Sequence, residues 1–268
     1  IGLDSMSDYY DVSLKEHRES MLMKYTDYRS IHKKLEEPGV LRNIFEEEKP
    51  DIVIHLAAQA GVRYSIDNPR SYLESNIVGT FELLEAARAN PPKHILLAST
   101  SSAYGANKEM PYREIDKADH QMSFYASTKK STEIMAHSYA HLFDLSVTMF
   151  RFFTVYGPWG RPDMALFKFT KAILEGKKID VYNYGNMERD FTYIDDLVEG
   201  IRLLIDANPA ITTKLAKSVI SNDSKSPVAP FRIVNIGNSK SEKLSDFILA
   251  VEKATKLKAN RNLMPIQP

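Results

Sequence analysis

Residues 51–58, Asp51-Ile-Val-Ile-His-Leu-Ala-Ala58, form a short and almost wholly apolar run after a Lys-Pro break. Such a run is typical of a parallel strand that is buried on both faces. Residues 69–90 carry apolar side chains at helical spacing and stop at two prolines, which predicts a helix. A second buried strand is predicted over residues 94–99. Strand, helix and strand in this order indicate an α/β fold with a doubly wound parallel sheet.

The alternation continues with a helix expected over about 123–142 and a strand over 145–153. After Pro158 the expected elements are shorter: helices over 164–175, 195–207 and 244–257, and strands over 178–182 and 231–236. Residues 208–230 hold three prolines and many polar residues, so they read as a long excursion. We therefore expect a Rossmann-like domain over residues 1–157 and a smaller C-terminal substrate-binding lobe over 158–268.

The chain starts with Ile1-Gly-Leu-Asp4, which reads as the end of a buried strand that stops on an acid. In a dinucleotide-binding fold this is the second strand, and its acid binds the adenosine ribose. The first strand and its glycine-rich turn are then expected upstream of Ile1, in a longer chain. Only 11 of the 268 residues are glycine, about 4% against the usual ~7%, which fits the absence of that turn.

Composition excludes several classes of protein. Lys and Arg number 35 and Asp and Glu number 35, so the zero balance argues against nucleic acid or an anionic membrane as partner. The absence of cysteine excludes disulfides, thiolate metal sites and a cysteine nucleophile, and fits the cytoplasm. No run of about 18 apolar residues is present, so no membrane span is expected. No metal site is expected either, because no His, Asp and Glu grouping has ligand spacing.

Tyr125 and Lys129 form a Y-x-x-x-K pair at the start of an expected helix. Residues four apart lie on one face of a helix. An ammonium held beside a phenol lowers its pKa from about 10 toward neutrality. Tyr125 is therefore a candidate general base for a sugar hydroxyl, and an amphipathic surface helix is the alternative interpretation.

Four hydroxyl side chains, Ser99-Thr-Ser-Ser102, follow the strand over 94–99. Ligands of open α/β sheets bind beyond the carboxyl ends of the strands, where hydroxyls can hold a hydroxyl or a carboxylate. A turn that caps local backbone is the alternative. Arg63, Arg161 and Arg189 are candidates for gripping an anion with two donors.

Together these stretches resemble the extended short-chain dehydrogenase/reductase family, which includes NAD-dependent epimerases and dehydratases. The matching motifs run in order through the chain: His55-Leu-Ala-Ala-Gln-Ala-Gly-Val-Arg63, Ser99-Thr-Ser-Ser-Ala-Tyr-Gly105, Tyr125-x-x-x-Lys129, Arg151-Phe-Phe-Thr-Val-Tyr-Gly-Pro-Trp-Gly-Arg-Pro-Asp163 and Arg189-Asp-Phe-Thr-Tyr-Ile-Asp-Asp196. Within the family, the likeness is greatest to enzymes that interconvert UDP-glucuronate and UDP-galacturonate.

The resemblance implies bound NAD and oxidation of the sugar at C4 through a 4-keto intermediate. It implies catalytic roles for Tyr125, Lys129 and Thr100. The implied cofactor-binding residues are Asp4, Leu35, Leu56, Ala57, Ala58, Gln59, Asn76, Ser99 and Lys129. The implied substrate-binding residues are Arg63, Ser101, Ser102, Thr154, Arg161 and Arg189, with Arg189 at the diphosphate. At the adenine, the chain has Lys34-Leu35 where the family usually has Asp-Ile.

The hydroxyl cluster separates this chain from relatives with other chemistries. Dehydratases of the family have an Asp-Glu pair where this chain has Ser101-Ser102, and decarboxylases have a Glu in this cluster. The alternatives left open are a 4-epimerase of another UDP-hexose and a non-catalytic nucleotide-binding relative. The resemblance also implies a homodimer, formed through the helices over 69–90 and 123–142, and a role in polysaccharide biosynthesis.

Overall fold

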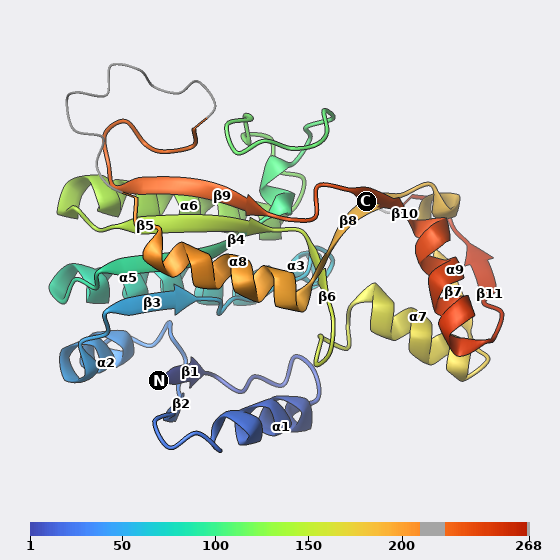
Figure 1. Cartoon of the computed structure of the whole chain (residues 1–268), viewed down its shortest axis with the longest axis horizontal. Coiled ribbons are helices and arrows are strands. Elements are labelled where there is room, and N and C mark those ends of the chain that lie inside the picture. Colours follow the sequence, from blue (N-terminus) through green and yellow to red (C-terminus); the bar gives the residue numbers. More distant parts are fainter. Residues whose placement is uncertain (210–222, 267–268) are drawn as a thin grey trace.

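The computed structural model describes residues 1–209 and 223–266, and its centre is a parallel four-stranded sheet (Figure 1). The strand order is β3-β4-β5-β9. The bounds are Ile52–His55 for β3, His94–Thr100 for β4, Val147–Phe152 for β5 and Phe231–Ile236 for β9. Every pair is parallel, with Thr100 opposite Phe152 and Phe152 opposite Ile236. The predicted α/β fold with a parallel sheet is confirmed.

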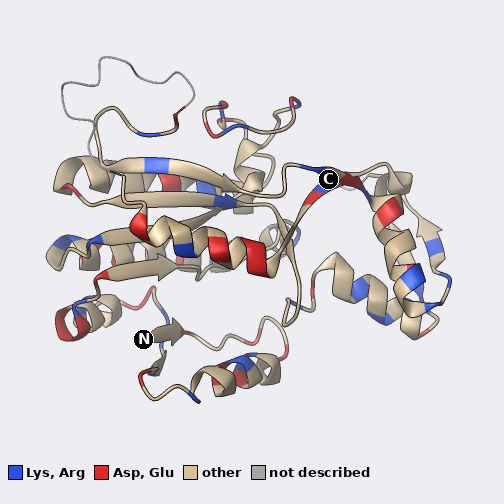
Figure 2. Ribbon diagram, in the orientation of Figure 1, with Lys and Arg blue, Asp and Glu red and all other residues tan. Residues whose placement is uncertain are grey.

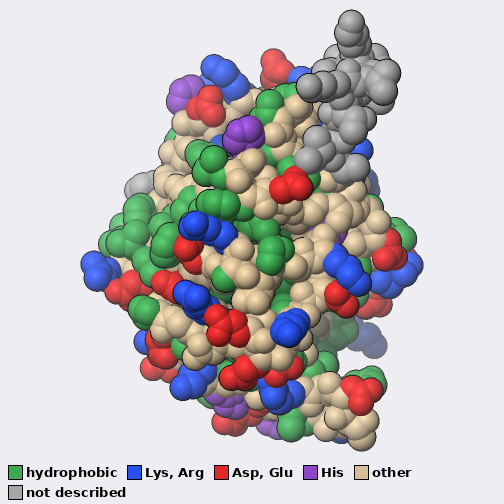
Figure 3. All heavy atoms as spheres, turned by 90° about the vertical axis from the view of Figure 1, so that its left-hand side faces the viewer, with side chains coloured by type: hydrophobic (Ala, Val, Ile, Leu, Met, Phe, Trp, Pro, Cys, Tyr) green, Lys and Arg blue, Asp and Glu red, His purple; other side chains and the backbone are tan. Residues whose placement is uncertain are grey.

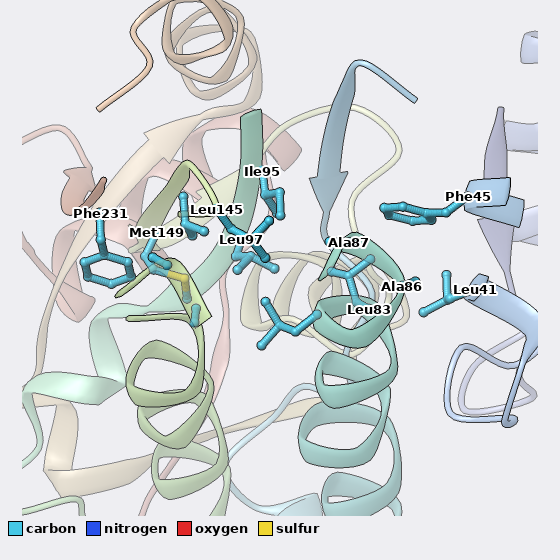
Figure 4. Packing of buried hydrophobic residues seen from close by; sticks show 14 of the residues in the cluster. Leu41, Phe45, Leu83, Ala86, Ala87, Ile95, Leu97, Leu145, Met149 and Phe231 are labelled. Atoms are coloured by element: carbon cyan, nitrogen blue, oxygen red, sulfur yellow. The ribbon is translucent and has the colours of Figure 1, made fainter. Parts of the chain in front are cut away.

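Strand β4 is buried along its whole length because helices cover both faces of the sheet. On one face, Ile95 and Leu97 pack against Leu83 in a cluster to which α2 (Val40–Glu48), α5 (Gly79–Ala89) and α6 (Phe124–Phe143) contribute (Figure 4). On the other face, Leu96 and Ala98 belong to a cluster with residues of α8 (Ile194–Asp206). Successive strand residues point to opposite faces, so an uninterrupted apolar run is what a two-sided core requires.

The predicted helix over 69–90 is realised as three joined segments. It consists of α4 (Pro69–Tyr72), the π-helix η1 (Leu73–Val78) and α5. The π-helix turns Asn76 into the interior, where its side chain is buried. Wide turns of this kind occur often at functional sites. The short helix α3 (Tyr64–Asp67) precedes these segments.

The first residues form a separate two-stranded parallel sheet. Strand β1 (Gly2–Asp4) pairs with β2 (Ser30–His32), and α1 (Val12–Leu22) lies between them in the sequence. The strand predicted to stop on Asp4 is therefore present. Elements α1, β2 and α2 were not predicted from the sequence.

A smaller lobe lies beyond the carboxyl ends of the central strands (Figure 1). Residues of α7 (Ala165–Leu174), β7 (Lys178–Val181) and α9 (Leu244–Thr255) form its apolar cluster, and β11 (Asn260–Leu263) pairs with β7. Strand β8 (Glu188–Tyr193) pairs with β6 (Thr154–Tyr156) and β10 (Ser241–Lys243). Two further one-turn segments are η2 (Ser101–Tyr104) and η3 (Tyr182–Gly185).

A single cut at residue 158 does not divide these layers, because α8 and β9 follow that residue and yet belong to the central sheet and its cover. The division into 1–157 and 158–268 thus describes the order of the motifs. The chain returns to the larger part with α8 and β9 and then goes back to the smaller lobe with α9 and β11. The excursion expected over 208–230 falls in large part on 210–222, outside the described residues.

Charged residues of both signs are spread over the elements of both parts (Figure 2). The end of the molecule opposite the small lobe shows the same mixture, with hydrophobic side chains between the charges (Figure 3). In residues 1–209 and 223–266, no helix has both the length and the apolar character needed to cross a bilayer.

Candidate active site

The carboxyl ends of the central strands face the small lobe (Figure 1). Thr100 is the last residue of β4, and its hydroxyl accepts a hydrogen bond from the Ser102 amide at 3.1 Å. Helix α6 starts after Ser123, whose side chain accepts from the Ala126 amide at 3.1 Å. This N-cap places Tyr125 in the first turn of α6, where the Thr100 hydroxyl is near enough to lower the pKa of its phenol.

Burial raises the pKa of the Tyr125 phenol, whereas the Thr100 hydroxyl and the positive charge of Arg161 act in the opposite direction. Lys129, which we expected to lower this pKa, lies one turn further along α6 and is only 3% exposed. Burial lowers the pKa of the Lys129 ammonium to about 8. Arg161 is therefore a cation that favours the phenolate.

His55 ends β3 beside this group and is buried. Burial and the nearby Lys129 charge lower the pKa of His55 to about 3. The imidazole is therefore neutral at physiological pH and adds no charge to the site.

The loop after β3 is held against the catalytic helix by Asn76. Its amide accepts from the Gln59 backbone N–H at 2.8 Å and donates to the Gln59 carbonyl at 3.1 Å. The same side chain donates to the Thr128 hydroxyl of α6 at 2.9 Å. Asn76 thus orders the Leu56–Gln59 segment expected to line the cofactor. Within it, Leu56 is 55% exposed, which is apolar surface that a ring could cover.

The three other residues expected at the cofactor lie in different settings. Asp4 is exposed at the end of β1, where it accepts from the Met6 amide at 2.7 Å and faces Lys15 at 3.6 Å. The Ser99 hydroxyl is buried and donates to Glu133 at 2.6 Å. Leu35 is buried in the core, closely packed on Gly79, and has little free surface.

Arg161 stands in a cluster that reaches across the sequence. Its guanidinium donates two hydrogen bonds to Asp163, at 3.0 and 2.5 Å. The Tyr9 hydroxyl donates to the same carboxylate at 3.2 Å. Because Arg161 also acts on the Tyr125 pKa, the cluster lies near the reacting end of the site.

The remaining residues expected at the substrate lie on several different elements. Ser101 and Ser102 are half-buried in η2, and Thr154 is half-buried in β6. The Arg63 guanidinium lies over the Tyr182 ring at 4.2 Å, which joins the loop after β3 to the small lobe. Arg189 is exposed on β8 and donates to the Glu188 carbonyl at 2.8 Å.

No role at the site was predicted from the sequence for three residues that lie there: Tyr9, Asp163 and Glu133. Glu133 is the one that sequence could have indicated, because it follows Lys129 by four residues and so shares its helix face. An acid on the face that packs against the sheet requires a buried partner. Tyr9 and Asp163 lie 154 residues apart and carry no local signal.

The residues present fit two parts of a dinucleotide cofactor. The exposed Asp4 carboxylate at a strand end suits ribose hydroxyls, and the Tyr125–Lys129 pair with exposed Leu56 suits the second ribose and a ring. A glycine-rich turn of the form G-x-x-G-x-x-G does not occur in the 268 residues. In the part of the chain that is described, no three His, Cys, Asp or Glu side chains gather as metal ligands.

Comparison with known proteins identifies the class to which this fold and site belong. Residues 5–215 match the NAD dependent epimerase/dehydratase family. The chain belongs to this family.

Individual relatives show which enzymes of the family this chain resembles. A probable UDP-glucuronate 4-epimerase of Rhizobium meliloti is 51% identical over 267 residues, which cover all of this chain and 78% of the relative. UDP-glucuronate 4-epimerase 3 of Arabidopsis thaliana is 44% identical over 270 residues, covering 99% of this chain and 61% of the relative. The crystal structure of UDP-glucuronic acid 4-epimerase from Bacillus cereus, with UDP-glucuronic acid and NAD, has a TM-score of 0.85 at 29% identity, covering 100% of this chain and 78% of its own.

Proposed function

We propose that this chain catalyses the NAD-dependent 4-epimerisation of a UDP-uronic acid, converting UDP-glucuronate to UDP-galacturonate through a 4-keto sugar. The observation that carries the proposal is the placement of Tyr125 and buried Lys129 one turn apart on α6, with Thr100 at the carboxyl end of β4 and Arg161 both acting on the pKa of the Tyr125 phenol. The proposal is supported by two relatives that match 99–100% of this chain and are described as a probable UDP-glucuronate 4-epimerase and as UDP-glucuronate 4-epimerase 3.

In this mechanism, Tyr125 takes the proton of the C4 hydroxyl and later returns it. Thr100, whose hydroxyl lowers the pKa of the phenol, is assigned a share in that proton transfer. Lys129 would hold Tyr125 and the nicotinamide ribose. NAD, when bound, would supply the hydride acceptor at C4 and would give the hydride back to the other face of the sugar once the flat 4-keto ring has turned over, so that no net oxidation results.

A 4-keto uronate is a β-keto acid and loses carbon dioxide readily when its carboxylate is twisted and desolvated. We assign restraint of the carboxylate to Ser101, Ser102 and Thr154, with Arg161 beside them. Hydroxyl donors and a guanidinium hold a carboxylate without offering an acid–base pair for elimination. Arg189 and Arg63 are assigned to the diphosphate side of the substrate.

For the cofactor, Asp4 is assigned to the adenosine ribose. The segment Leu56–Gln59, ordered by Asn76, is assigned to the ring and its linker. Ser99 is assigned a contact through its backbone, because its hydroxyl is engaged by Glu133. Leu35 is assigned to the edge of the adenine pocket.

The test of the catalytic assignment is Tyr125→Phe in the full chain. Removing the phenolic proton acceptor should reduce turnover of UDP-glucuronate at least 100-fold, within the usual range for a general base, and leave nucleotide binding intact. Tyr139→Phe is the matched control: this tyrosine lies on the same helix and donates to Glu85 at 2.6 Å. Activity that survives Tyr125→Phe would refute the mechanism and would favour a different base.

Substrate class is tested by comparing UDP-glucuronate with UDP-glucose. Arg161 and the hydroxyls predict faster turnover of the acidic sugar. Faster turnover of UDP-glucose would identify a 4-epimerase of neutral hexoses instead. Nucleotide binding with turnover of neither sugar would identify a non-catalytic relative.

We also propose that the protein is a homodimer that works in the cytoplasm. Helices α5 and α6 carry exposed hydrophobic residues, among them Phe81, Ile134 and Leu142, which a partner's helices could cover. A chain without cysteine suits a reducing compartment. Light scattering that gives a monomer mass at micromolar concentration would contradict the dimer.

A further inference from the structure

Residues 4–18, which we call the N-terminal strap, run from the end of β1 into α1 and lie against the loop that follows β6 (Figure 1). That loop carries Arg161. No residue of α1 is buried, so the apolar packing that places most helices in proteins is weak here. Polar contacts therefore have to hold the strap, and several of them run to the Arg161 loop.

Arg18 of α1 binds two backbone carbonyls of this loop. Its Nη2 donates to the Trp159 carbonyl at 2.5 Å and to the Gly160 carbonyl at 3.3 Å. Its Nη1 donates to the Tyr10 hydroxyl at 2.8 Å, and the guanidinium lies 5.6 Å from the centre of the Tyr10 ring. Arg18 is thus oriented by Tyr10 and holds the two residues that come directly before Arg161.

The backbone that accepts these bonds has a conformation that requires support. Trp159 has a φ of 62°, in the left-handed region that residues with side chains rarely adopt. A Cβ on Gly160 would lie 2.6 Å from the Phe167 ring, so the chain is also closely packed there. Strained residues of this kind persist only where the surrounding structure holds them. The charged hydrogen bonds of Arg18 provide such a hold immediately before Arg161.

The strap also contacts the Arg161 side chain itself, through Tyr9. The Tyr9 hydroxyl donates to Asp163 at 3.2 Å, and Asp163 accepts both hydrogen bonds of the Arg161 guanidinium. The centre of the Tyr9 ring lies 5.8 Å from that guanidinium. The strap therefore fixes both the backbone before Arg161 and the carboxylate that orients its side chain.

A row of tyrosine rings connects this arginine with the candidate base. From Tyr9 the row passes through Tyr64 and Tyr72 to Tyr125, with ring centres 4.8, 6.2 and 6.0 Å apart. Each ring contacts the next, so the Arg161 cluster lies beside the first turn of α6. A change in the position of the strap therefore affects the substrate side of the site.

The other end of the strap is fixed as well. Lys15, whose side chain is 11% exposed, lies 3.6 Å from the Asp4 carboxylate. Its ammonium donates to the Ser7 hydroxyl at 3.1 Å and lies 5.1 Å from the centre of the Tyr10 ring. The strap is thus attached to the end of β1 on one side and to the Arg161 loop on the other.

We propose that Arg18 is a positioning residue for the substrate: by holding the carbonyls of Trp159 and Gly160, it sets Arg161 for the carboxylate of a UDP-uronic acid. This inference rests on the proposed function in one respect, the assignment of Arg161 to that carboxylate. Arg18 acts through two backbone groups and is assigned no contact with the substrate.

The test is Arg18→Met in the full chain with saturating NAD, read by calorimetry as the apparent dissociation constants of UDP-glucuronate and UDP. UDP shares the nucleotide of the substrate and lacks the uronate. Binding of UDP-glucuronate should weaken roughly tenfold, the effect of losing one charged hydrogen bond, and binding of UDP should stay as in the wild type. Equal weakening of both ligands, or of neither, would overturn the proposal.

Trp159 gives a second readout, which does not depend on activity. It is the one tryptophan of the 268 residues and is 49% exposed, so its fluorescence reports on the loop that Arg18 holds. In Arg18→Met, acrylamide should quench this fluorescence more strongly, and the emission maximum should lie at longer wavelength, because the loop is more open to water. Emission and quenching unchanged from the wild type would show that the loop does not depend on Arg18.

Arg29→Met is the matched control. Arg29 follows α1 closely in the chain, but its guanidinium pairs with Glu48 of α2 and has no hydrogen bond to residues 159–163 among the described residues. This variant also removes one arginine from the N-terminal region. Affinity for both ligands and the fluorescence of Trp159 should stay as in the wild type. A selective loss of UDP-glucuronate binding in Arg29→Met would contradict a specific role of Arg18.

If Arg18→Met does not fold, Arg18→Gln takes its place. Glutamine is a good helix former, but it is uncharged and too short to replace the guanidinium at the two carbonyls. The same selective loss of UDP-glucuronate binding is expected, and wild-type affinity would refute the proposal. The proposed function fails in other measurements, through activity that survives Tyr125→Phe or through faster turnover of UDP-glucose by the wild type.

Discussion

The molecule holds two bidentate arginine–carboxylate pairs near the candidate active site, and they differ in burial. Arg151 and Glu133 are 1% and 2% exposed, whereas Arg161 and Asp163 are 30% and 25% exposed. The first pair is enclosed by β4, β5 and α6, and the second joins the loop after β6 to the N-terminal Tyr9. The same pair of groups is thus enclosed in one place and partly open to solvent in the other, where we propose that Arg161 binds the substrate carboxylate.

Removing one partner of the buried pair should have the largest effect on stability. Arg151→Met leaves the Glu133 carboxylate buried and without its main counter-ion, which should cost about 3–5 kcal/mol. Arg161→Met leaves Asp163 in partial contact with water and should cost less than about 1 kcal/mol. Urea unfolding followed by circular dichroism measures both. Equal losses in the free energy of unfolding would contradict the idea that burial makes the Arg151–Glu133 pair more important for stability.

Replacing Arg161, the more exposed arginine, should lower kcat/KM for the substrate more than it lowers stability. Arg161→Lys keeps the positive charge but loses the two-donor geometry. A charged hydrogen bond contributes about 1.5–3 kcal/mol, so kcat/KM for UDP-glucuronate should fall roughly 10- to 100-fold. The value for UDP-glucose should change much less, because that sugar carries no carboxylate. A parallel loss for both sugars would contradict the assignment of Arg161 to the carboxylate.

Lowering the pH should show the same difference between the buried Arg151–Glu133 pair and the more exposed Arg161–Asp163 pair. The pKa values of Glu133 and Asp163 are both lowered in the folded protein, from 4.5 and 3.8. Each carboxylate therefore contributes stability that is present above the unfolded value and is lost as the pH falls through the folded one. Across pH 5 to 3, the free energy of unfolding should fall less steeply in Glu133→Gln than in the wild type. Asp163→Asn should change that slope less, because the pair is partly solvated.

The smallest expected effect belongs to Tyr9→Phe. It removes only the hydroxyl that donates to Asp163 at 3.2 Å, a bond that contributes about 0.5–1.5 kcal/mol. Stability should change by no more than this, and kcat/KM for UDP-glucuronate should fall severalfold through looser positioning of Arg161. Tyr10→Phe, in the neighbouring residue, is the comparison variant. If Tyr9→Phe lowers activity as much as Arg161→Lys, Tyr9 itself contacts the substrate.

The central strands could be predicted because their signal is local. The run over 94–99 is apolar on both alternating sides, and the structure places β4 between two hydrophobic clusters. Tyr125 could be placed in the first turn of a helix because Ser123 is a good N-cap. Elements without such patterns could not be predicted from the sequence. One of them is α1, which has no buried residue.

The return of β9 to the central sheet was not predictable from its own residues. The run over 231–236 reads as a strand in either part, and only its pairing with β5 assigns it to the larger layer. The π-helix likewise lies within an ordinary helical pattern, and the bonds of Asn76 to the loop after β3 accompany its wider turn.

Sequence alone determined the layered α/β fold, the family motifs and the candidate base, since each depends on residues close together in the chain. Tertiary structure alone decided which charges are paired and how deeply. Glu133 meets Arg151 and Ser99 only after a helix packs on two strands, and Tyr9 meets Asp163 across 154 residues. The strength of an ion pair depends on its distance from water, and that distance exists only in the folded chain.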